Sequence, residues 1–195
     1  MSLTTACIKG RMGSIEYYQT TMTAQEAVSS LRAASELRDE WLSLGIEERF
    51  QRELSMPRVE KEIAPYFATD EHRFISSLVV LIRDPQEFGF EPLDSVVGNI
   101  SLAYRGATSN MGFLTVAGGE NIILDGQHRH AGIRMAIQAD FETLDRWIEQ
   151  RADSELQAIQ DDDISVIFIK IDDNEVIRKI FNKINKHAKK TSTAD

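Results

Sequence analysis

The chain has 195 residues, a formal net charge of −9 at pH 7 and one cysteine, Cys7. No apolar run reaches the length of about 20 residues that a membrane helix needs, so an integral membrane protein is not expected. A single cysteine excludes an internal disulfide and a zinc cage built from cysteines, and the N-terminus lacks the apolar core of a secretory signal, so we expect a cytoplasmic protein.

The first part of the chain predicts a strand followed by a helix. Residues 14–22 (SIEYYQTTM) are rich in aromatic and β-branched residues, which is typical of a strand. Thr23 is a good helix N-cap, and Glu26 follows it at the spacing of a capping box. The helix that opens there has apolar residues on one face and is expected to continue to Gly45.

The next segments predict helix, strand and loop in turn. A second helix is expected at 46–54, before Pro57, and a short helix or turn at 58–67. Residues 74–83 (FISSLVVLIR) form an uninterrupted apolar run, which favours a strand buried on both faces. Residues 86–110 are punctuated by Gly, Pro and Asn and are predicted to be loops.

Two strands are predicted on either side of a double glycine. Residues 111–117 favour a strand, Gly118-Gly119 a hairpin turn, and 121–124 the strand that pairs across it. After a short polar cluster, helical spacing begins and is expected to last to about Ala139.

The last third of the chain is predicted to be helix, strand and helix. A charged helix is expected at about 141–160, a strand at 164–171 (ISVIFIKI) and a final helix at 174–187. No internal repeat or low-complexity linker interrupts the chain. We therefore predict one α/β (α+β) domain over residues 1–195.

The most informative stretch is residues 122–133, with the sequence IILDGQHRHAGI. Its apolar run ends abruptly in Asp-Gly and helical spacing follows at once, which predicts a strand, a tight turn and a helix N-terminus. Helix N-termini present backbone N–H groups and the positive end of the helix dipole, and they bind anions. We therefore predict a phosphate-binding turn at this strand–helix junction.

Each residue of the turn has chemistry suited to that role. Asp125 can cap the helix, hold a metal or orient a neighbour. Gly126 permits a positive φ and lets a ligand approach the backbone, and Gln127 both donates and accepts hydrogen bonds. His128 can donate to a phosphate or move a proton near neutral pH, and Arg129 offers a planar fork for phosphate oxygens.

Other readings of this stretch stay open. The polar residues could simply be exposed to water at a helix N-terminus, and His130 could face a ligand or pack into the fold. The patterns GxxxxGK[ST] and GxGxxG are absent, so neither a P-loop nor a dinucleotide fold is supported. No metal site is predicted, because the acidic residues at 161–163 and 172–173 suit turns at strand ends.

Basic residues are concentrated near the C-terminus. Asn185, Lys189 and Ser192 are predicted to approach the same phosphates from the other side. A set of lysines is predicted to contact DNA: Lys183, Lys186 and Lys190. A basic helix end that complements the macrodipole is the alternative.

The five residues from Asp125 to Arg129 spell DGQHR, the signature of the DGQHR-domain proteins. That family resembles the ParB/sulfiredoxin superfamily, whose members place a GCHR or GERR turn under nucleotide phosphates. Residues 126–129 align with both versions of the turn. Because Gln127 replaces the cysteine of sulfiredoxin, the resemblance implies phosphate contact by His128 and Arg129 without thiol chemistry.

Further blocks of the chain extend the resemblance. They are 16–22 (EYYQTTM), 74–82, and 181–192 (FNKINKHAKKTS). The pattern is similar to the DndB-like proteins of bacterial DNA phosphorothioation systems, with DpdB of 7-deazaguanine DNA-modification systems as a near neighbour. It implies a ParB/sulfiredoxin-like mixed sheet flanked by helices, in either a short member of the family or the N-terminal part of a longer protein.

The resemblance implies a nucleotide-binding and hydrolysing domain of a DNA-modification or defence system. Asp125, Gln127, His128 and Arg129 would be catalytic, with Gly126 also at the nucleotide. Gln127 would position a water, His128 and Arg129 would stabilise charge on the phosphate, and Mg²⁺ would be held largely by a nucleoside triphosphate, with ATP favoured. DNA and other DNA-modification proteins would be its partners. The alternatives are a DNA-binding transcriptional regulator without turnover and a scaffold whose turn is purely structural.

Overall fold

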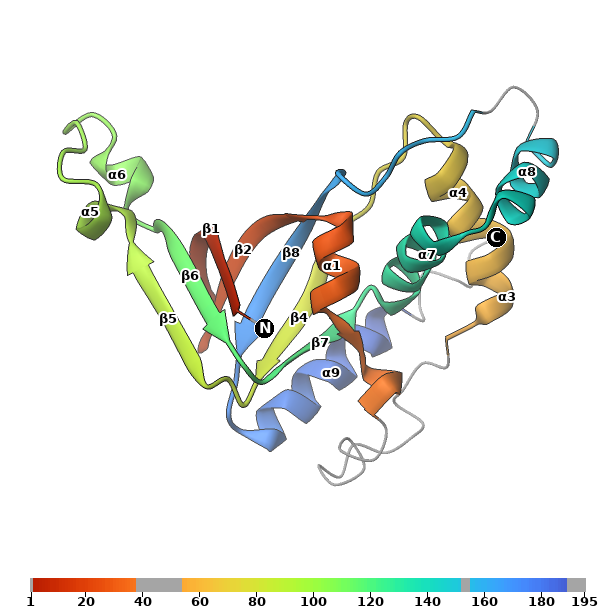
Figure 1. The fold of residues 1–195 in the computed structure, drawn as a ribbon. Coiled ribbons are helices and arrows are strands. Elements are labelled where there is room, and N and C mark those ends of the chain that lie inside the picture. The colour runs from red at the N-terminus through yellow and green to blue at the C-terminus, as the bar shows by residue number, and fades with distance from the viewer. Residues whose placement is uncertain (1, 38–53, 152–154, 189–195) are drawn as a thin grey trace.

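The computed structural model describes residues 2–37, 54–151 and 155–188 as one mixed sheet with helices around it (Figure 1). The strands in these ranges are β1 (Ser2–Met12), β2 (Ile15–Thr23), β3 (Arg32–Ala33), β4 (Leu78–Arg83), β5 (Glu87–Pro92), β6 (Met111–Ala117), β7 (Glu120–Asp125) and β8 (Asp163–Lys170). They lie in the order β3-β7-β4-β8-β2-β1-β6-β5, and the pairs β3/β7 and β4/β8 are parallel. The predicted mixed α/β class is confirmed.

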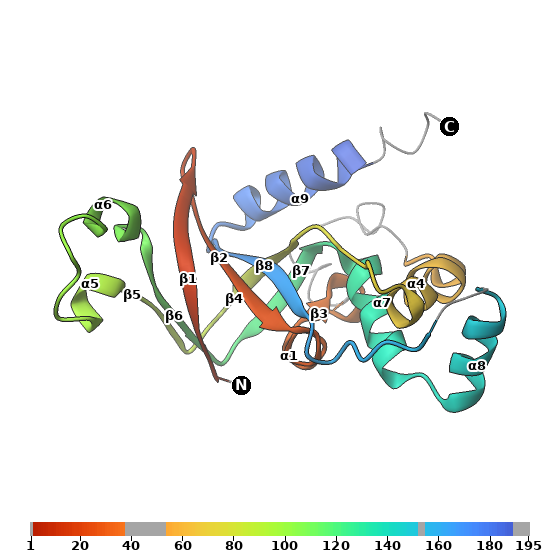
Figure 2. The ribbon, with the colours of Figure 1, turned by 90° about the horizontal axis from the view of Figure 1, so that it is seen from above.

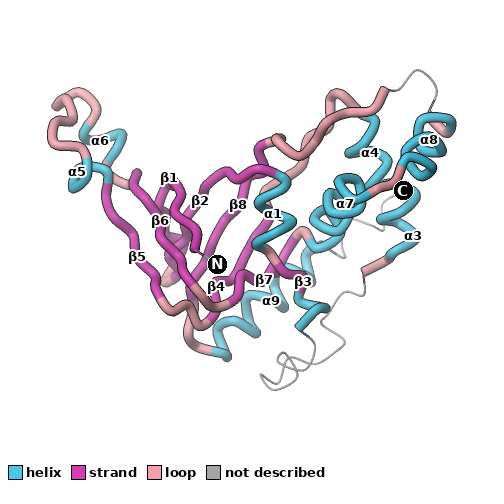
Figure 3. The backbone as a smooth tube through the Cα atoms, in the orientation of Figure 1, coloured by secondary structure: helices cyan, strands magenta, loops and turns pink. Residues whose placement is uncertain are grey.

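The helices lie at both ends of the sheet and over its two faces. They are α1 (Ala24–Ser30), α3 (Met56–Arg58), α4 (Ala64–Thr69), α5 (Leu93–Val96), α6 (Arg105–Thr108), α7 (Gln127–Gln138), α8 (Phe141–Glu149) and α9 (Asn174–Ala188). A 3₁₀ turn, η1 (Ala34–Leu37), follows β3, and a π-helical segment, η3 (Val59–Ile63), joins α3 to α4. Figure 3 shows α3, α4, α7 and α8 together, with α5 and α6 at the opposite end.

The sheet buries apolar side chains on both faces. Tyr18, Val80 and Phe168 belong to the larger cluster, which α1, α4, α7 and α8 cover. Leu81 and Ile169, which alternate with these residues along the strands, belong to a second cluster beneath α9. Figure 2 shows α9 on the opposite side of the sheet from α1. The central strands are therefore apolar on both faces, as the runs at 74–83 and 164–171 predicted.

A sharp corner joins the two halves of the sheet. β5 pairs with β6 and β4 pairs with β7, while β4 runs into β5 and β6 runs into β7 at the corner (Figure 1). The turns need positive φ angles of 46° at Asp84, 66° at Gly118 and 65° at Gly119. A Cβ atom on Gly119 would lie 2.3 Å from the Arg83 carbonyl oxygen, so only glycine fits the close approach of the two turns.

The hairpin predicted across Gly118-Gly119 is wrong in its pairing. The predicted strands exist as β6 and β7, but β6 pairs with β1 and β5, and β7 pairs with β4 and β3. The double glycine turns the chain as expected. Instead of pairing β6 with β7, the turn directs the two strands to different partners in the sheet.

The predicted helix after Thr23 begins correctly and ends early. Thr23 and Glu26 form the predicted capping box, with reciprocal hydrogen bonds of 3.1 and 2.8 Å. The helix ends at Ser30, however, because residues 32–33 leave it to pair in parallel with β7. Pairing along a sheet edge thus wins over local helical spacing.

Other differences concern element bounds. The first strand of the chain is β1, which was not predicted, and the predicted strand at 14–22 is β2. The loop-rich region 86–110 contains β5 and the short helices α5 and α6, which were not predicted, and the charged helix predicted at 141–160 ends at Glu149. The strand predicted at 74–83 begins at Leu78. The short helix or turn predicted at 58–67 lies within the helical segment 56–69, the strand predicted at 164–171 is β8, and the final helix predicted at 174–187 is α9. Residues 46–53 of the predicted second helix lie outside the described ranges.

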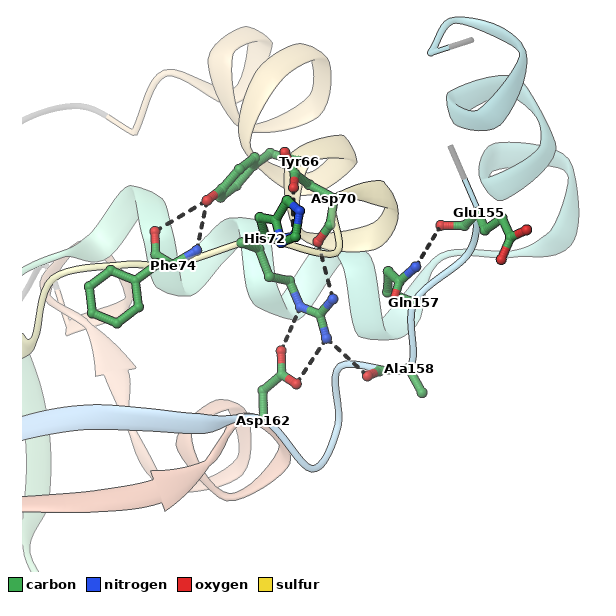
Figure 4. Close-up of polar contacts among 9 residues, drawn as sticks. Tyr66, Asp70, His72, Phe74, Glu155, Gln157, Ala158 and Asp162 are labelled. Carbon is green, nitrogen blue, oxygen red and sulfur yellow. Dashed lines mark hydrogen bonds and ion pairs between the residues drawn. The ribbon is translucent and has the colours of Figure 1, made fainter. Parts of the chain in front are cut away.

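Arg73 fastens the segment before β8 to the end of α4. Its Nε and Nη2 atoms donate to the two carboxylate oxygens of Asp162 at 2.6 and 2.9 Å, and Nη2 also donates to the Ala158 carbonyl at 3.2 Å (Figure 4). Nη1 donates to the Asp70 carbonyl at 3.2 Å. The side chain is 12% exposed, so this bidentate ion pair is largely shielded from water.

Replacing Arg73 by alanine should lower the free energy of unfolding by about 2–3 kcal/mol, because the change removes charge-assisted hydrogen bonds and leaves Asp162 and two carbonyls without this donor. Urea denaturation followed by circular dichroism measures it. Arg105→Ala, at an exposed arginine of α6 with one 3.4 Å hydrogen bond, is the matched control and should change stability by less than about 0.5 kcal/mol. Equal losses in the two variants would contradict the assignment.

Candidate functional site

The predicted strand–turn–helix junction is present where β7 passes into α7. Gly126 is the N-cap of α7 and has a φ of 96°, a conformation that disfavours residues with a Cβ atom. A Cβ at this position would lie 2.4 Å from Cδ2 of Leu78, a fully buried residue of β4. The predicted positive φ of Gly126 is therefore confirmed, and packing against Leu78 is a second reason for glycine here.

Helix α7 differs from three other helices in its N-terminal cap. Side chains of Thr23, Asp140 and Asp173 accept backbone hydrogen bonds at the starts of α1, α8 and α9. Gly126 has no side chain to do so, and Asp125 is not the N-cap, contrary to one of its predicted roles. Helix α7 thus begins without a side-chain cap.

Asp125 and Arg129 form an ion pair along the first turn. Arg129 Nη2 donates to Asp125 Oδ2 at 2.9 Å. Its Nη1 atom donates to the carbonyl and the hydroxyl of Ser76 and, at 3.2 Å, to the Ser77 carbonyl. The guanidinium therefore joins the turn after β7 to the residues that lead into β4.

Gln127 and His128 begin the helix side by side. Gln127 Nε2 donates to the Ile123 carbonyl at 3.2 Å, which directs the amide back along β7. His128 Nε2 accepts from the backbone N–H of Ser55 at 3.1 Å, so the neutral ring has its proton on Nδ1. Both side chains are half-buried.

His130 packs into the fold, which resolves its two predicted readings. It is 1% exposed, and its Nε2 atom lies 3.2 Å from the Ala27 carbonyl of α1. The pKa of the imidazole is lowered from 6.5 to about 4, mainly by burial. The bond to Ala27 and the Glu36 carboxylate act in the opposite direction, and the nearby Arg134 guanidinium adds to the lowering. His130 is therefore neutral at pH 7.

A hollow of about 220 Å³ lies over the start of α7. Its lining consists of Arg58, Ile63, Leu124 and the five residues of the turn from Asp125 to Arg129. Arg58 was not predicted as a site residue. It lies nearly 70 positions before the motif, in a segment whose only sequence signal was helix formation, and no pattern connected it to the turn.

A larger hollow of about 780 Å³ lies along α7 toward α8. Its walls include His130, Trp147 and the ion pair between Arg134 and Glu36, whose N–O distance is 2.6 Å. None of the predicted site residues lines it.

The basic C-terminal helix approaches the junction only in part. Phe181 of α9 and Leu124 of β7 belong to the same apolar cluster, so the second half of α9 packs near the end of β7. Lys183 is exposed on this helix. The backbone of α9 includes Asn185 and Lys186, and the predicted residues Lys189, Lys190 and Ser192 lie outside the described ranges.

The described residues offer neither a metal cluster nor a membrane-spanning helix. Among them, no three His, Cys, Asp or Glu side chains lie close enough together to hold a metal ion. Within the same ranges, no helix combines the length and the apolar character needed to cross a bilayer.

The described chain is a mixed α/β protein in which a polar helix start without a side-chain cap follows β7 of one bent sheet. The family model of DndB, described as DNA-sulfur modification-associated, matches residues 5–194. The chain therefore belongs to the DndB family, as its resemblance predicted, and is associated with DNA phosphorothioation. No curated protein and no solved structure matches the chain.

Proposed function

We propose that this DndB-family protein binds the phosphates of a nucleoside triphosphate at the first turn of α7 and hydrolyses it. The observation that carries the proposal is the uncapped N-terminus of α7, which lies beside Arg58 and His128 in one small hollow. Backbone N–H groups, a helix dipole and a guanidinium in one place suit an anion with several oxygens. ATP is the first candidate, and Mg²⁺ would be held largely by its phosphates.

The residues of the turn then divide the chemistry of hydrolysis. Gln127 uses its amide N–H on the Ile123 carbonyl, so its Oε1 atom would accept a hydrogen bond from the attacking water. The Nδ1–H of His128 would donate to a phosphate oxygen and stabilise the charge that develops there. The Asp125 carboxylate is 39% exposed and would receive the proton released by the water.

Release of inorganic phosphate from ATP with Mg²⁺ tests the proposal. His128→Ala should lower the rate about 100-fold, because one preorganised donor to the transferred phosphate is lost. His72→Ala is the matched control, since His72 is 86% exposed and lies outside the hollow, and it should keep the wild-type rate. Absence of release by the wild type, or equal release by both variants, would refute the hydrolytic function.

Duplex DNA is the second source of phosphate that the family association suggests. Lys179 and Lys183 are exposed on α9, and Lys179 is 65% exposed while it pairs with Glu175. As a regulator without turnover, the protein would bind duplex DNA with an affinity that falls steeply with salt. In a gel-shift assay Lys183→Ala would weaken that binding, and wild-type protein that does not shift DNA at low salt would exclude this alternative.

A further inference from the structure

The guanidinium of Arg129 is occupied within the protein. An arginine has five N–H donors in a fixed fork, and here both terminal nitrogens are hydrogen-bonded to protein oxygens. Nη1 contacts three oxygens of Ser76 and Ser77, and Nη2 contacts Asp125. The side chain is 22% exposed. A phosphate that used this fork would have to displace several hydrogen bonds at once.

Arg58 lines the same hollow but is more exposed to solvent than Arg129 and makes fewer hydrogen bonds with the protein. Its side chain is 55% exposed, and its ion pair with Glu62, 3.4 Å away, is formed with a residue that is itself 68% exposed. Such an exposed pair one helical turn apart is weak and easily exchanged. Arg58 can therefore turn to an incoming anion at little cost.

The position of Arg58 over the turn is fixed by the backbone. The N–H of Ser55 donates to His128 Nε2 at 3.1 Å, which holds the start of α3 against the start of α7. Arg58 follows three residues later, at the end of α3, and Ile63 of η3 packs against Gly132 of α7, where a Cβ would lie 2.4 Å from Ile63 Cγ2. These close contacts between the segment 55–63 and α7 keep Arg58 beside the hollow.

We propose that the two arginines divide the work: Arg58 is the cation that contacts the bound phosphate, and Arg129 is a positioning residue that fixes the turn to the entry of β4. This inference rests on the proposed nucleotide binding and changes which arginine meets the ligand. In this division the turn at residues 125–129 does not complete the site alone, because a second segment of the chain supplies the cation for the ligand.

Nucleotide affinity and thermal stability, measured on the same variants, test this division. Arg58→Ala should weaken the Kd for ATP with Mg²⁺ about tenfold or more, as loss of a charge-assisted contact does. Its melting temperature without nucleotide should stay within about 1 °C of the wild type, and Arg58→Lys should recover part of the affinity. Arg129→Ala should lower the melting temperature without nucleotide by about 3–6 °C, and Ser76→Ala should lower it less, with the wild-type Kd. Arg105→Ala is the control for both measurements.

The outcomes separate this inference from the function on which it rests. Wild-type protein that does not bind ATP refutes the proposed function and the inference together. Wild-type binding that Arg58→Ala retains in full refutes the role of Arg58 alone. A variant Arg129→Ala that melts like the wild type but has lost its ATP affinity would make Arg129 the phosphate ligand and overturn the division.

Discussion

Replacing Gly126 by alanine should lower the free energy of unfolding by about 2–4 kcal/mol. The φ of 96° at this residue costs any L-residue conformational energy. In addition, the new methyl group would lie 2.4 Å from Cδ2 of Leu78, which is 0% exposed, so the packing of the core around Leu78 must shift to admit it. Backbone strain and overpacking of the core therefore both destabilise the folded state of this variant.

Gly98→Ala provides the matched control, because a Cβ atom added to Gly98 would meet no other atom within 4 Å and the residue has no positive φ. It should stay within about 0.5 kcal/mol of the wild type. Urea denaturation of both variants measures the difference. If the two glycine variants were equally stable, the left-handed cap of α7 would not be the conformation of the protein in solution.

The sequence predicted those elements whose signals are local. Thr23 and Glu26 cap α1 as expected because both partners of the capping box lie within one turn of helix. The start of α7 was predicted for the same reason, since an apolar strand, a glycine and a helical repeat are contiguous there. Each of these features is determined by residues fewer than about ten positions apart.

Strand pairing could not be predicted in this way. The pattern around Gly118 and Gly119 is that of a hairpin, and nothing nearby distinguishes a hairpin from the corner that the structure has. The choice depends on β1, whose residues 2–8 pair with β6 more than 100 positions away. The early end of α1 has a similar cause, because residues 32–33 pair with β7.

In the site, too, local features were predicted from the sequence and long-range contacts were not. The residues from Asp125 to Arg129 were found because they are consecutive, but their partners come from distant segments. Ser76 lies 53 positions from Arg129, and Ser55 lies 73 positions from His128. The sequence therefore predicted which residues stand at the turn. It could not predict that Arg129 would be hydrogen-bonded to Ser76 and Ser77, or that Arg58 would line the same hollow as the turn.

Acid should destabilise the protein through His130 in particular. The folded-state pKa is about 4, below the value of 6.5 expected in the unfolded chain, so between these values the unfolded state binds more protons. Stability from this residue is thus present above pH 6.5 and is lost as the pH falls toward 4. At 1.36 kcal/mol for each pKa unit, the loss amounts to about 3 kcal/mol. Full burial of the ring is the main cause, because a charged imidazole would lose its hydration there.

Urea denaturation at pH 7, 6, 5 and 4 measures this loss in the wild type and in His130→Gln, which keeps a donor for the Ala27 carbonyl but does not titrate. The variant should lose about 3 kcal/mol less than the wild type over this range, since its carboxylates are unchanged and the histidine contribution alone is removed. His72→Gln is the control, because His72 is 86% exposed and should leave the pH dependence as it is. If wild type and His130→Gln had the same pH dependence, the ring would not be the source of the acid sensitivity. The assignment of a buried, neutral imidazole between α1 and α7 would then be refuted.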